Sequence, residues 1–367
     1  MRILITTDAV GGVWTFAKQL TLALLARGCH VSLVSFGRIP SDRQINGLNS
    51  LTVRWGAHFR FTALDVPLEW MTDNRGAYSE AEPFLLKEVK HFRADLVVSS
   101  QYCFGALPFD GPKIIVAHSD VLSWAKACRG VELSPSAWLD QYSALVAEGL
   151  AYADAVVAPT HWMLHALEEH FRIPGELHVI HNGRSLSSPP VTSGRRLQAV
   201  AAGRFWDEGK NLQLLADIKL KFPLLVAGDT GSASSQTPTT LGDVTFVGPL
   251  DENDVLSLFR QSAIYVCPSR YEPFGLAPLE AALCGCAVIA NNIPSLHEVW
   301  GDAALFFDDA ESLSALLAQL SRNDSALLHA RKQARWRAAQ YTASRMGDAY
   351  LELFRSLLSR GVRQYAA

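Results

Sequence analysis

The chain has 367 residues, which is more than one compact core usually holds, so its length favours two domains. Hydrophobic residues make up 49% and charged residues 19%, and the formal net charge of −3 argues against nucleic acid as the main partner. No window approaches the ~20 apolar residues of a membrane span, and the start does not resemble a signal peptide. The six cysteines form no CxxC pair, which indicates reduced packing residues in a cytoplasmic protein.

Apolar runs alternate with helical patterns in the first half of the chain. Residues 2–7 (RILITT) predict a strand, residues 13–27 an amphipathic helix, and residues 30–36 (HVSLVSF) a second strand, which together form a βαβ unit. Further short apolar runs predict strands at residues 95–100, 113–120, 154–159 and 177–183. The stretch from Ser185 to Arg196 is rich in Ser and Pro and has no periodicity, which favours a linker between two domains.

The same alternation restarts after this linker. Strands are predicted at residues 197–203, 223–229, 244–248, 263–269 and 287–292. Helices are predicted at residues 211–222, 253–262, 275–285 and, near the end of the chain, 344–360. Continuous apolar strands separated by helices are typical of a parallel sheet that is covered on both faces. The chain is therefore predicted to be an α/β protein with two doubly wound, Rossmann-like domains and a cleft between them.

Two glycines, Gly11 and Gly12, separate the first predicted strand from the first predicted helix. Glycine lets the backbone come close to a ligand, and the N–H groups that start a helix attract anions. A tight turn is the structural alternative. The loop is not the GxGxxG fingerprint of dinucleotide-binding proteins, and no suitably placed acid follows the second strand, which argues against NAD as a cofactor.

A loop with two cations follows the first predicted strand of the second half. Arg204 and Lys210 lie near its two ends, and Asn211 closes it as an expected helix N-cap. Ligands of open α/β sheets bind at the carboxyl ends of strands, where a guanidinium and an ammonium group suit a diphosphate. A solvated charged loop is the alternative. Because the sequence has no Asp-x-Asp pattern and no metal-like histidine spacing, these two cations rather than a metal are predicted to supply the positive charge.

The segment SRYEPFGLAPLEAALCGCAV, residues 269–288, places two glutamates around the start of a predicted helix. Glu272 lies in the preceding loop and Glu280 in the first turns of the helix, while a Pro-Phe-Gly turn opens a possible anion site. Ordinary stabilisation of the helix dipole by acids is the alternative. The apolar neighbours of Glu280 predict a buried helix, in which its carboxylate should meet hydroxyl or N–H groups.

His118 ends a predicted strand of the first half and is expected to face the cleft. A histidine in this place is either a structural hydrogen-bonding group or a ligand contact. Asp120, two residues later, either orients the imidazole ring or caps the next segment. These residue patterns alone leave both alternatives open.

Taken together, these motifs resemble those of the retaining glycosyltransferases of family four, which have the GT-B fold. The resemblance is carried by Gly11-Gly12, by Gly203-Arg204 with Lys210-Asn211, and by the E-x7-E signature from Glu272 to Glu280. It implies that residues 1–185 form an acceptor-binding domain and residues 186–343 a nucleotide-sugar-binding domain. It also implies that the last helix, within residues 344–367, packs back on the first domain.

The resemblance also implies roles for individual residues. Arg204 and Lys210 would bind the diphosphate, Glu280 the ribose hydroxyls and Glu272 the hydroxyls of the transferred sugar. The implied catalytic residues are Arg204, Lys210, Glu272 and His118, and the implied donor-binding residues are Gly11, Gly12, Phe274, Gly275, Leu276 and Glu280. In this interpretation no metal and no cofactor is needed, because the donor is itself a substrate.

The expected activity is transfer of a hexosyl group from a donor of the UDP-glucose or GDP-mannose type to a hydroxyl acceptor, with retention by a front-face mechanism. The acceptor is expected to be a sugar, a lipid-linked sugar or a small molecule, and the aromatic segment at residues 55–70 could give peripheral membrane contact. The alternatives are a nucleotide-sugar epimerase or a phosphorylase of the same fold, and a non-catalytic nucleotide-sugar-binding protein.

Overall fold

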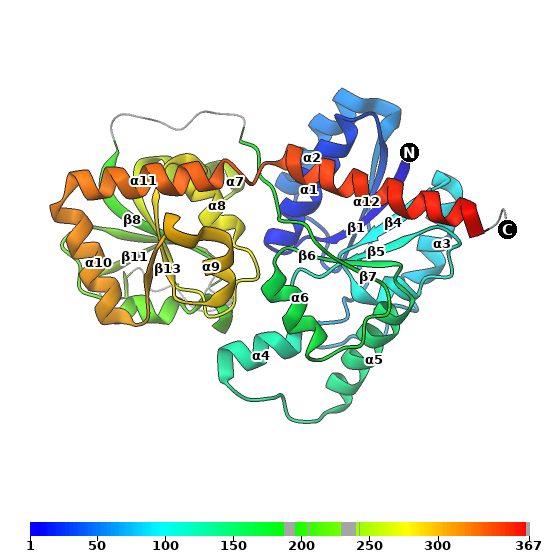
Figure 1. Ribbon diagram of the computed structural model, residues 1–367, viewed down its shortest axis with the longest axis horizontal. Helices are drawn as coiled ribbons and strands as arrows, with labels where there is room; N and C mark the ends of the chain where they lie inside the picture. Colours follow the sequence, from blue (N-terminus) through cyan, green and yellow to red (C-terminus); the bar gives the residue numbers. More distant parts are fainter. Residues whose placement is uncertain (187–194, 205, 229–239, 242, 365–367) are drawn as a thin grey trace. The chain divides into compact units, whose positions relative to one another are not determined.

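The computed structural model describes residues 1–186, 195–204, 206–228, 240–241 and 243–364 of the chain. The chain divides into two compact units (Figure 1). The first unit comprises Met1–Ala125, Val131–Ser185 and Ala343–Ala367, and the second comprises Lys126–Gly130 and Leu186–Thr342. Residues 126–130, expected in the first domain, therefore group with the second unit. Most of the linker expected from Ser185 to Arg196 lies outside the described residues.

A seven-stranded sheet forms the centre of the first unit. Its strands are β1 (Arg2–Asp8), β2 (His30–Phe36), β3 (Phe59–Ala63), β4 (Leu96–Ser99), β5 (Lys113–Val116), β6 (Ala155–Ala158) and β7 (Glu176–Val179). Their order is β3-β2-β1-β4-β5-β6-β7, and every neighbouring pair is parallel. All six strands predicted in this half are confirmed, and the short edge strand β3 is an addition.

Helices and 3-10 turns connect these strands. They are α1 (Gly12–Leu25), α2 (Asp42–Trp55), η1 (Gly56–His58), α3 (Glu82–Phe92), η2 (Tyr102–Ala106), α4 (Val121–Arg129), α5 (Ala137–Tyr152) and α6 (His161–Glu168). The segment at residues 55–70, named above for peripheral membrane contact, contributes Phe59, Val66 and Leu68 to buried positions. Trp70, at 39% exposed, is its main outward-facing aromatic residue.

The helix α12 (Ala343–Gln364) belongs to the first unit, although residues 186–342 precede it in the chain. It packs against α1, as Figure 1 shows for the red helix beside the blue one. Its apolar stripe, which includes Met346, Tyr350 and Phe354, is buried, as the spacing in the sequence predicts. An ion pair of 2.7 Å between Arg27 and Asp348 lies at the rim of the same contact.

A second seven-stranded sheet forms the centre of the second unit. Its strands are β8 (Arg196–Ala202), β9 (Leu224–Ala227), β10 (Thr240–Leu241), β11 (Val244–Gly248), β12 (Ser262–Cys267), β13 (Ala287–Asn291) and β14 (Leu305–Phe307). Their order is β10-β11-β9-β8-β12-β13-β14. All pairs are parallel except β10 with β11, a two-residue antiparallel contact at the edge. The first unit and the second unit thus have the same doubly wound architecture.

The helical segments of the second unit differ from expectation at one place. They are η3 (Glu208–Lys210), η4 (Leu212–Asp217), α7 (Glu252–Gln261), α8 (Leu276–Cys284), α9 (Pro294–Trp300), η5 (Gly301–Ala303), α10 (Ala310–Arg322) and α11 (Asp324–Ala338). The helix predicted at residues 211–222 is wrong, because only the 3-10 turn η4 forms there. The N–H groups of Lys219 and Leu220 donate to the side chains of Ser314 and Asp243, which takes them away from a helical ladder.

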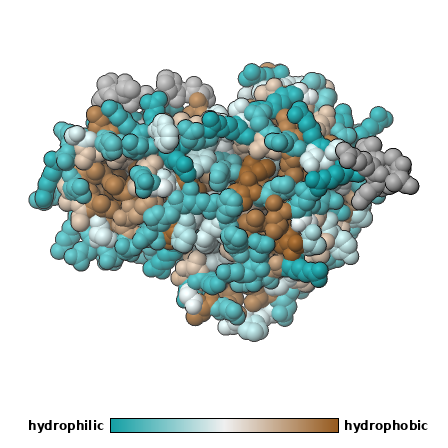
Figure 2. Space-filling model, viewed as in Figure 1, coloured by the Kyte–Doolittle hydropathy of each residue, from teal (hydrophilic) through white to brown (hydrophobic). Residues whose placement is uncertain are grey.

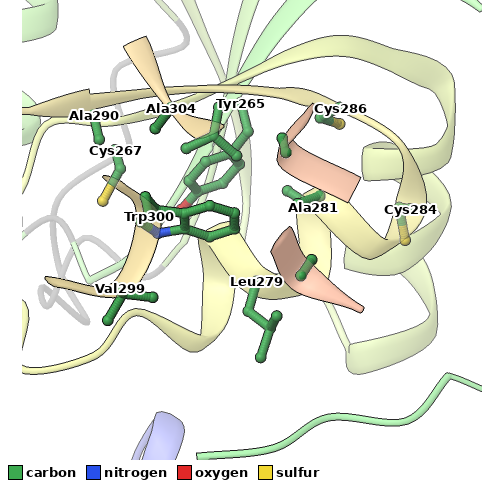
Figure 3. Packing of buried hydrophobic residues seen from close by; sticks show 14 of the residues in the cluster. Tyr265, Cys267, Leu279, Ala281, Cys284, Cys286, Ala290, Val299, Trp300 and Ala304 are labelled. Atoms are coloured by element: carbon green, nitrogen blue, oxygen red, sulfur yellow. The ribbon is translucent and has the colours of Figure 1, made fainter. Parts of the chain in front are cut away.

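The core of the second unit holds α8 firmly against the sheet. Leu279, Ala281 and Ala282 of this helix are fully buried in a cluster that also contains Tyr265 and Trp300. Figure 3 shows these two large rings among smaller side chains of the cluster. Small residues let the helix lie close to the strands, and close packing resists displacement. Residues at the start of α8 are therefore carried on a rigid support.

Figure 2 shows a visible face on which hydrophilic residues surround smaller apolar patches. Among the described residues, no helix is long and apolar enough to cross a membrane. All six cysteines are free thiols and five are buried, as expected of packing residues.

Candidate functional site

Two loops meet at the carboxyl edge of the second sheet. One follows β8 and the other follows β12, and these strands are neighbours. The N–H groups of Arg270 and Tyr271 donate to the carbonyl oxygen of Gly209, at 2.9 and 3.3 Å. The side-chain amide of Asn211 donates to the carbonyl oxygen of Pro268 at 3.1 Å, so it joins the loops and does not cap a helix as expected. Parallel neighbouring strands thus bring two distant motifs together, where ligands of such sheets bind.

Lys210 and Glu272 form an ion pair in which Nζ and Oε2 are 2.7 Å apart. Their side chains are only 23% and 12% exposed, and the hydroxyl of Ser269 donates to the same carboxylate oxygen at 3.2 Å. Burial alone would lower the pKa of Lys210, but the charge of Glu272 outweighs it and the pKa of Lys210 is raised. The ammonium group is therefore a permanent cation at neutral pH.

Arg204 lies on the same loop with its guanidinium group held on two sides. Its Nη2 is 2.7 Å from Oδ2 of Asp207, and its Cζ lies 5.1 Å from the centre of the Trp206 ring. Burial opposes ionisation of Asp207, but the charge of Arg204 and its hydrogen bond keep the pKa of that carboxyl group below its usual value. Both members of this pair are therefore charged.

The turn before α8 presents backbone rather than side chains. Gly275 has a φ of 90°, and a Cβ atom there would lie 2.7 Å from the ring of Pro278, so glycine is required. Phe274 is buried, and its ring packs edge-on against Tyr341 at 5.4 Å. Leu276 begins the helix. The N–H groups of residues 274–276 are thus the groups of this turn that suit an anion.

Glu280 lies in the middle of α8 and is partly exposed. Its neighbours Leu279 and Ala281 are fully buried, as their apolar character predicts. The expectation that Glu280 itself is enclosed is wrong, because its side chain occupies the less buried side of the helix. A partly exposed carboxylate can accept hydrogen bonds from the hydroxyl groups of a ligand.

In the first unit, the glycine turn lies at the carboxyl end of β1. Gly11 has φ 61° and ψ −133° and immediately precedes α1, which begins at Gly12. The carboxylate of Asp8 accepts the N–H of Val10 at 2.7 Å, which fixes the turn. The N-cap residue Gly11 has no side chain to cap the helix, so the first N–H groups of α1 stay candidates for an anion site.

His118 follows β5 and lies close to the same turn. Its Nε2 is 3.2 Å from the hydroxyl oxygen of Ser100, and its ring packs edge-on against Phe16 of α1 at 4.5 Å. Desolvation lowers the pKa of His118 to about 3, so the imidazole is neutral near pH 7. The structure therefore places His118 against Phe16 of α1 on the first unit, and it brings Lys210 and Glu272 together on the second.

Several residues at these edges were not singled out from the sequence. Asp207, Ser269 and Ser100 each follow a strand, and their position after an apolar run is the signal that could have revealed them. Glu69 had no such signal, since it lies in a loop that fits no motif. It is 2% exposed, its carboxylate accepts the N–H of Tyr102 at 2.8 Å, and burial raises its pKa to about 7.

In the part of the chain that the structure describes, no group of three or more His, Cys, Asp or Glu side chains is placed to hold a metal ion. Arg204 and Lys210 are the cations that the sequence analysis assigned to the candidate site of the second unit, and both are in ion pairs.

Two family patterns match the chain. Residues 10–188 match the family described as Glycosyltransferase Family 4, and residues 210–340 match Glycosyl transferases group 1. The first match covers most of the first unit except residues 343–367, and it includes Gly11 and His118. The second match begins at Lys210 and includes Glu272 and Glu280.

Characterised proteins resemble parts of the chain. The O-antigen chain mannosyltransferase B of Escherichia coli is 33% identical over 117 residues, which is 30% of this chain and 31% of that protein. The alpha-maltose-1-phosphate synthase of Mycobacterium tuberculosis is 26% identical over 282 residues, covering 66% of this chain and 68% of that protein. The chain thus spans less than a third of the length of the mannosyltransferases it matches.

A solved structure resembles nearly the whole chain. The Anabaena protein HepE, in complex with UDP-glucose, has a TM-score of 0.71 and 14% sequence identity. The match covers 97% of this chain and all of that chain. At this identity, the similarity concerns the fold.

Proposed function

The chain belongs to glycosyltransferase family 4, with the GT-B fold, and on that premise we propose that it transfers a hexosyl group from a nucleoside-diphosphate sugar to a hydroxyl acceptor with retention. The observation that carries the proposal is the ion pair between Lys210 and Glu272 at the carboxyl edge of the second sheet. In this proposal, Lys210 is the cation that binds phosphate and Glu272 is the acid that binds the sugar. Such a pair matches the two halves of a sugar diphosphate, one anionic and one rich in hydroxyl groups.

The proposed donor is UDP-glucose or GDP-mannose, a nucleotide sugar of either type. Two observations support this class. HepE was solved with UDP-glucose, and a partial relative is named a mannosyltransferase. The acceptor is proposed to be a sugar, a lipid-linked sugar or a small molecule that the first unit binds. A cytoplasmic location is proposed on the strength of six unpaired thiols.

The proposed chemistry is stabilisation of a leaving diphosphate. As the bond to the sugar breaks, negative charge grows on the diphosphate, and Arg204, Lys210 and the N–H groups of residues 274–276 are fixed to receive it. Loss of one such donor typically raises a transition-state barrier by about 3 kcal/mol. No metal is required in this proposal, because two permanent cations and a helix start supply the positive charge.

The remaining residues have proposed binding roles. Glu280 accepts hydrogen bonds from the ribose hydroxyls, and Glu272 from the hydroxyls of the transferred sugar. His118 is neutral, so one ring nitrogen can donate and the other accept, which suits a sugar hydroxyl. The acceptor hydroxyl attacks from the face that the diphosphate leaves, and the diphosphate takes its proton.

The test is an assay of nucleoside-diphosphate release from UDP-glucose and GDP-mannose with a set of hydroxyl acceptors, run in the presence of a chelator. We expect Lys210→Gln and Glu280→Ala to lower turnover at least 100-fold, because each removes a direct contact to the donor. Lys219→Gln, which neutralises an exposed lysine of the same unit, is the matched control and should keep wild-type turnover.

Three outcomes would contradict the proposal. Wild-type turnover by either site variant would show that the substituted residue does not have the donor-binding role proposed for it. Release that does not depend on an acceptor would favour an epimerase or a hydrolytic side reaction, and tight donor binding without any turnover would favour a sensor. Activity that the chelator abolishes and Mg²⁺ or Mn²⁺ restores would refute metal independence.

A further inference from the structure

Asp207 is an acid with no part in the chemistry described above, yet it contacts a cation at the centre of that chemistry. It lies between Arg204 and Lys210 in sequence, on the loop that follows β8. Its side chain is 11% exposed, and its Oδ2 is 2.7 Å from the guanidinium group of Arg204. An acid so close to a diphosphate-binding cation opposes the binding of any anion there.

The backbone fixes the position of this carboxylate. Its other oxygen, Oδ1, accepts the N–H of Gly209 at 3.0 Å, which makes Asp207 the N-cap of η3. Gly209 in turn accepts the N–H of Arg270 from the neighbouring loop at 2.9 Å. Asp207 is therefore part of the frame that joins the two loops, so it is held in place whichever group Arg204 binds.

Arg204 is more exposed than its partner Asp207, and not all of its N–H donors have a hydrogen-bond partner among the described residues. Its side chain is 35% exposed and rests against Trp206, which is 51% exposed. A guanidinium group has five N–H donors. Its buried Nε has no hydrogen-bond partner among the described residues. The exposed part of the Arg204 guanidinium group can therefore donate to a diphosphate oxygen while Nη2 stays bound to Asp207.

The proposed function assigns the diphosphate to Arg204, and on that assignment we propose that Asp207 is a positioning residue that sets the affinity of this subsite. Its carboxylate orients the guanidinium group toward the donor and cancels one of two positive charges. The subsite therefore holds a nucleoside-diphosphate product weakly enough for release. Without the carboxylate, the same cations bind the product more tightly and turnover slows at the release step.

Two substitutions separate the charge of Asp207 from its structural part. Asp207→Asn keeps the shape and an oxygen, and Asp207→Ser keeps the ability to cap the N–H of Gly209. The matched control is Glu208→Gln, which removes an adjacent charge whose partner is Arg129 at 2.7 Å. Binding of UDP, GDP and inorganic pyrophosphate is measured by titration calorimetry at low and high salt, and kcat and KM are measured for donor turnover.

For both Asp207 variants we expect about tenfold tighter binding of a nucleoside diphosphate at low salt, with the gain reduced at high salt because charges are screened. KM for the donor and kcat should fall together, and the control should match the wild-type protein. A merely structural role would instead weaken binding and leave no salt-dependent gain.

Two results overturn the inference in different ways. Wild-type protein that binds UDP or GDP, with equal or weaker binding by both Asp207 variants, overturns the role of Asp207 alone. Absence of binding by the wild-type protein and by every variant overturns the proposed function and, with it, this inference.

Discussion

At the scale of single residues, the contact between Lys210 and Glu272 could not be predicted from the sequence. Each was assigned a ligand role from its own motif, but 62 residues separate them. Their contact depends on β8 and β12 being neighbours in the sheet, and strand order is a property of the folded unit. The pairing of Arg204 with Asp207 is local, three residues apart, and could have been proposed from the sequence.

Glu69 makes the stability of the first unit depend on pH. Burial raises the pKa of this carboxyl group from 4.5 to about 7, although the N–H of Tyr102 partly offsets the effect. The folded state therefore holds the proton more tightly than the unfolded chain. It follows that the free energy of unfolding falls as pH rises from about 4.5 to 7 and stays lower above that range.

We expect Glu69→Gln to abolish this dependence. Glutamine keeps an oxygen for the N–H of Tyr102 and carries no charge. The free energy of unfolding of the variant at pH 8 should therefore exceed that of the wild-type protein by up to about 3 kcal/mol. The two proteins should have equal free energies of unfolding near pH 3, where the wild-type carboxyl group is protonated in both states. Denaturant unfolding across this pH range measures the difference, and parallel curves would contradict the assignment.

At the scale of elements, the strands were the most predictable part of the fold. Continuous apolar runs identified eleven of the fourteen strands that the described residues form. The edge strands β3, β10 and β14 were not predicted, because they are short or only partly buried. The helix expected at residues 211–222 failed because side chains from distant segments take up its N–H groups. Local propensity is a weak guide where tertiary contacts satisfy the backbone.

The contact of α5 with η2 depends on two glycines. A Cβ atom at Gly149 would lie 1.8 Å from the carbonyl oxygen of Tyr102, and one at Gly105 would lie 2.0 Å from that of Gly149. We expect Gly149→Ala to lower the free energy of unfolding by about 3 kcal/mol, because backbone segments must separate.

Gly47, inside α2, is the matched control for this prediction. The nearest atom to a Cβ there is Nζ of Lys18 at 3.8 Å, an ordinary contact. Gly47→Ala should therefore raise stability by up to about 1 kcal/mol through helix propensity. Both values come from denaturant unfolding, and a Gly149 variant as stable as the Gly47 variant would show that α5 and η2 do not approach closely.

At the scale of the whole molecule, α12 completes a unit that begins at Met1. It buries several large side chains, among them Met346, Tyr350, Leu353, Phe354 and Leu357. At about 2 kcal/mol for each buried side chain, this stripe contributes on the order of 10 kcal/mol. Domains are usually stable by only about 5–15 kcal/mol.

We therefore expect removal of residues 343–367 to unfold the first unit while leaving the second unit folded. Limited proteolysis followed by mass spectrometry tests this, since fragments from residues 186–342 should persist and those from residues 1–185 should be degraded. A control that ends after Gln364 removes only the last three residues and should resist proteolysis like the full chain. Protection of residues 1–185 in the shorter protein would show that α12 is dispensable.

The return of α12 to α1 also has a consequence in time. A ribosome makes the chain from its amino end, so α1 emerges long before the helix that covers it. Residues 186–342 are made in between, which takes roughly 8–30 s at typical rates of synthesis. During that interval the apolar side of α1 that later contacts α12 is uncovered. The nascent first unit therefore exposes this apolar surface, of the kind that chaperones bind, until α12 has emerged from the ribosome.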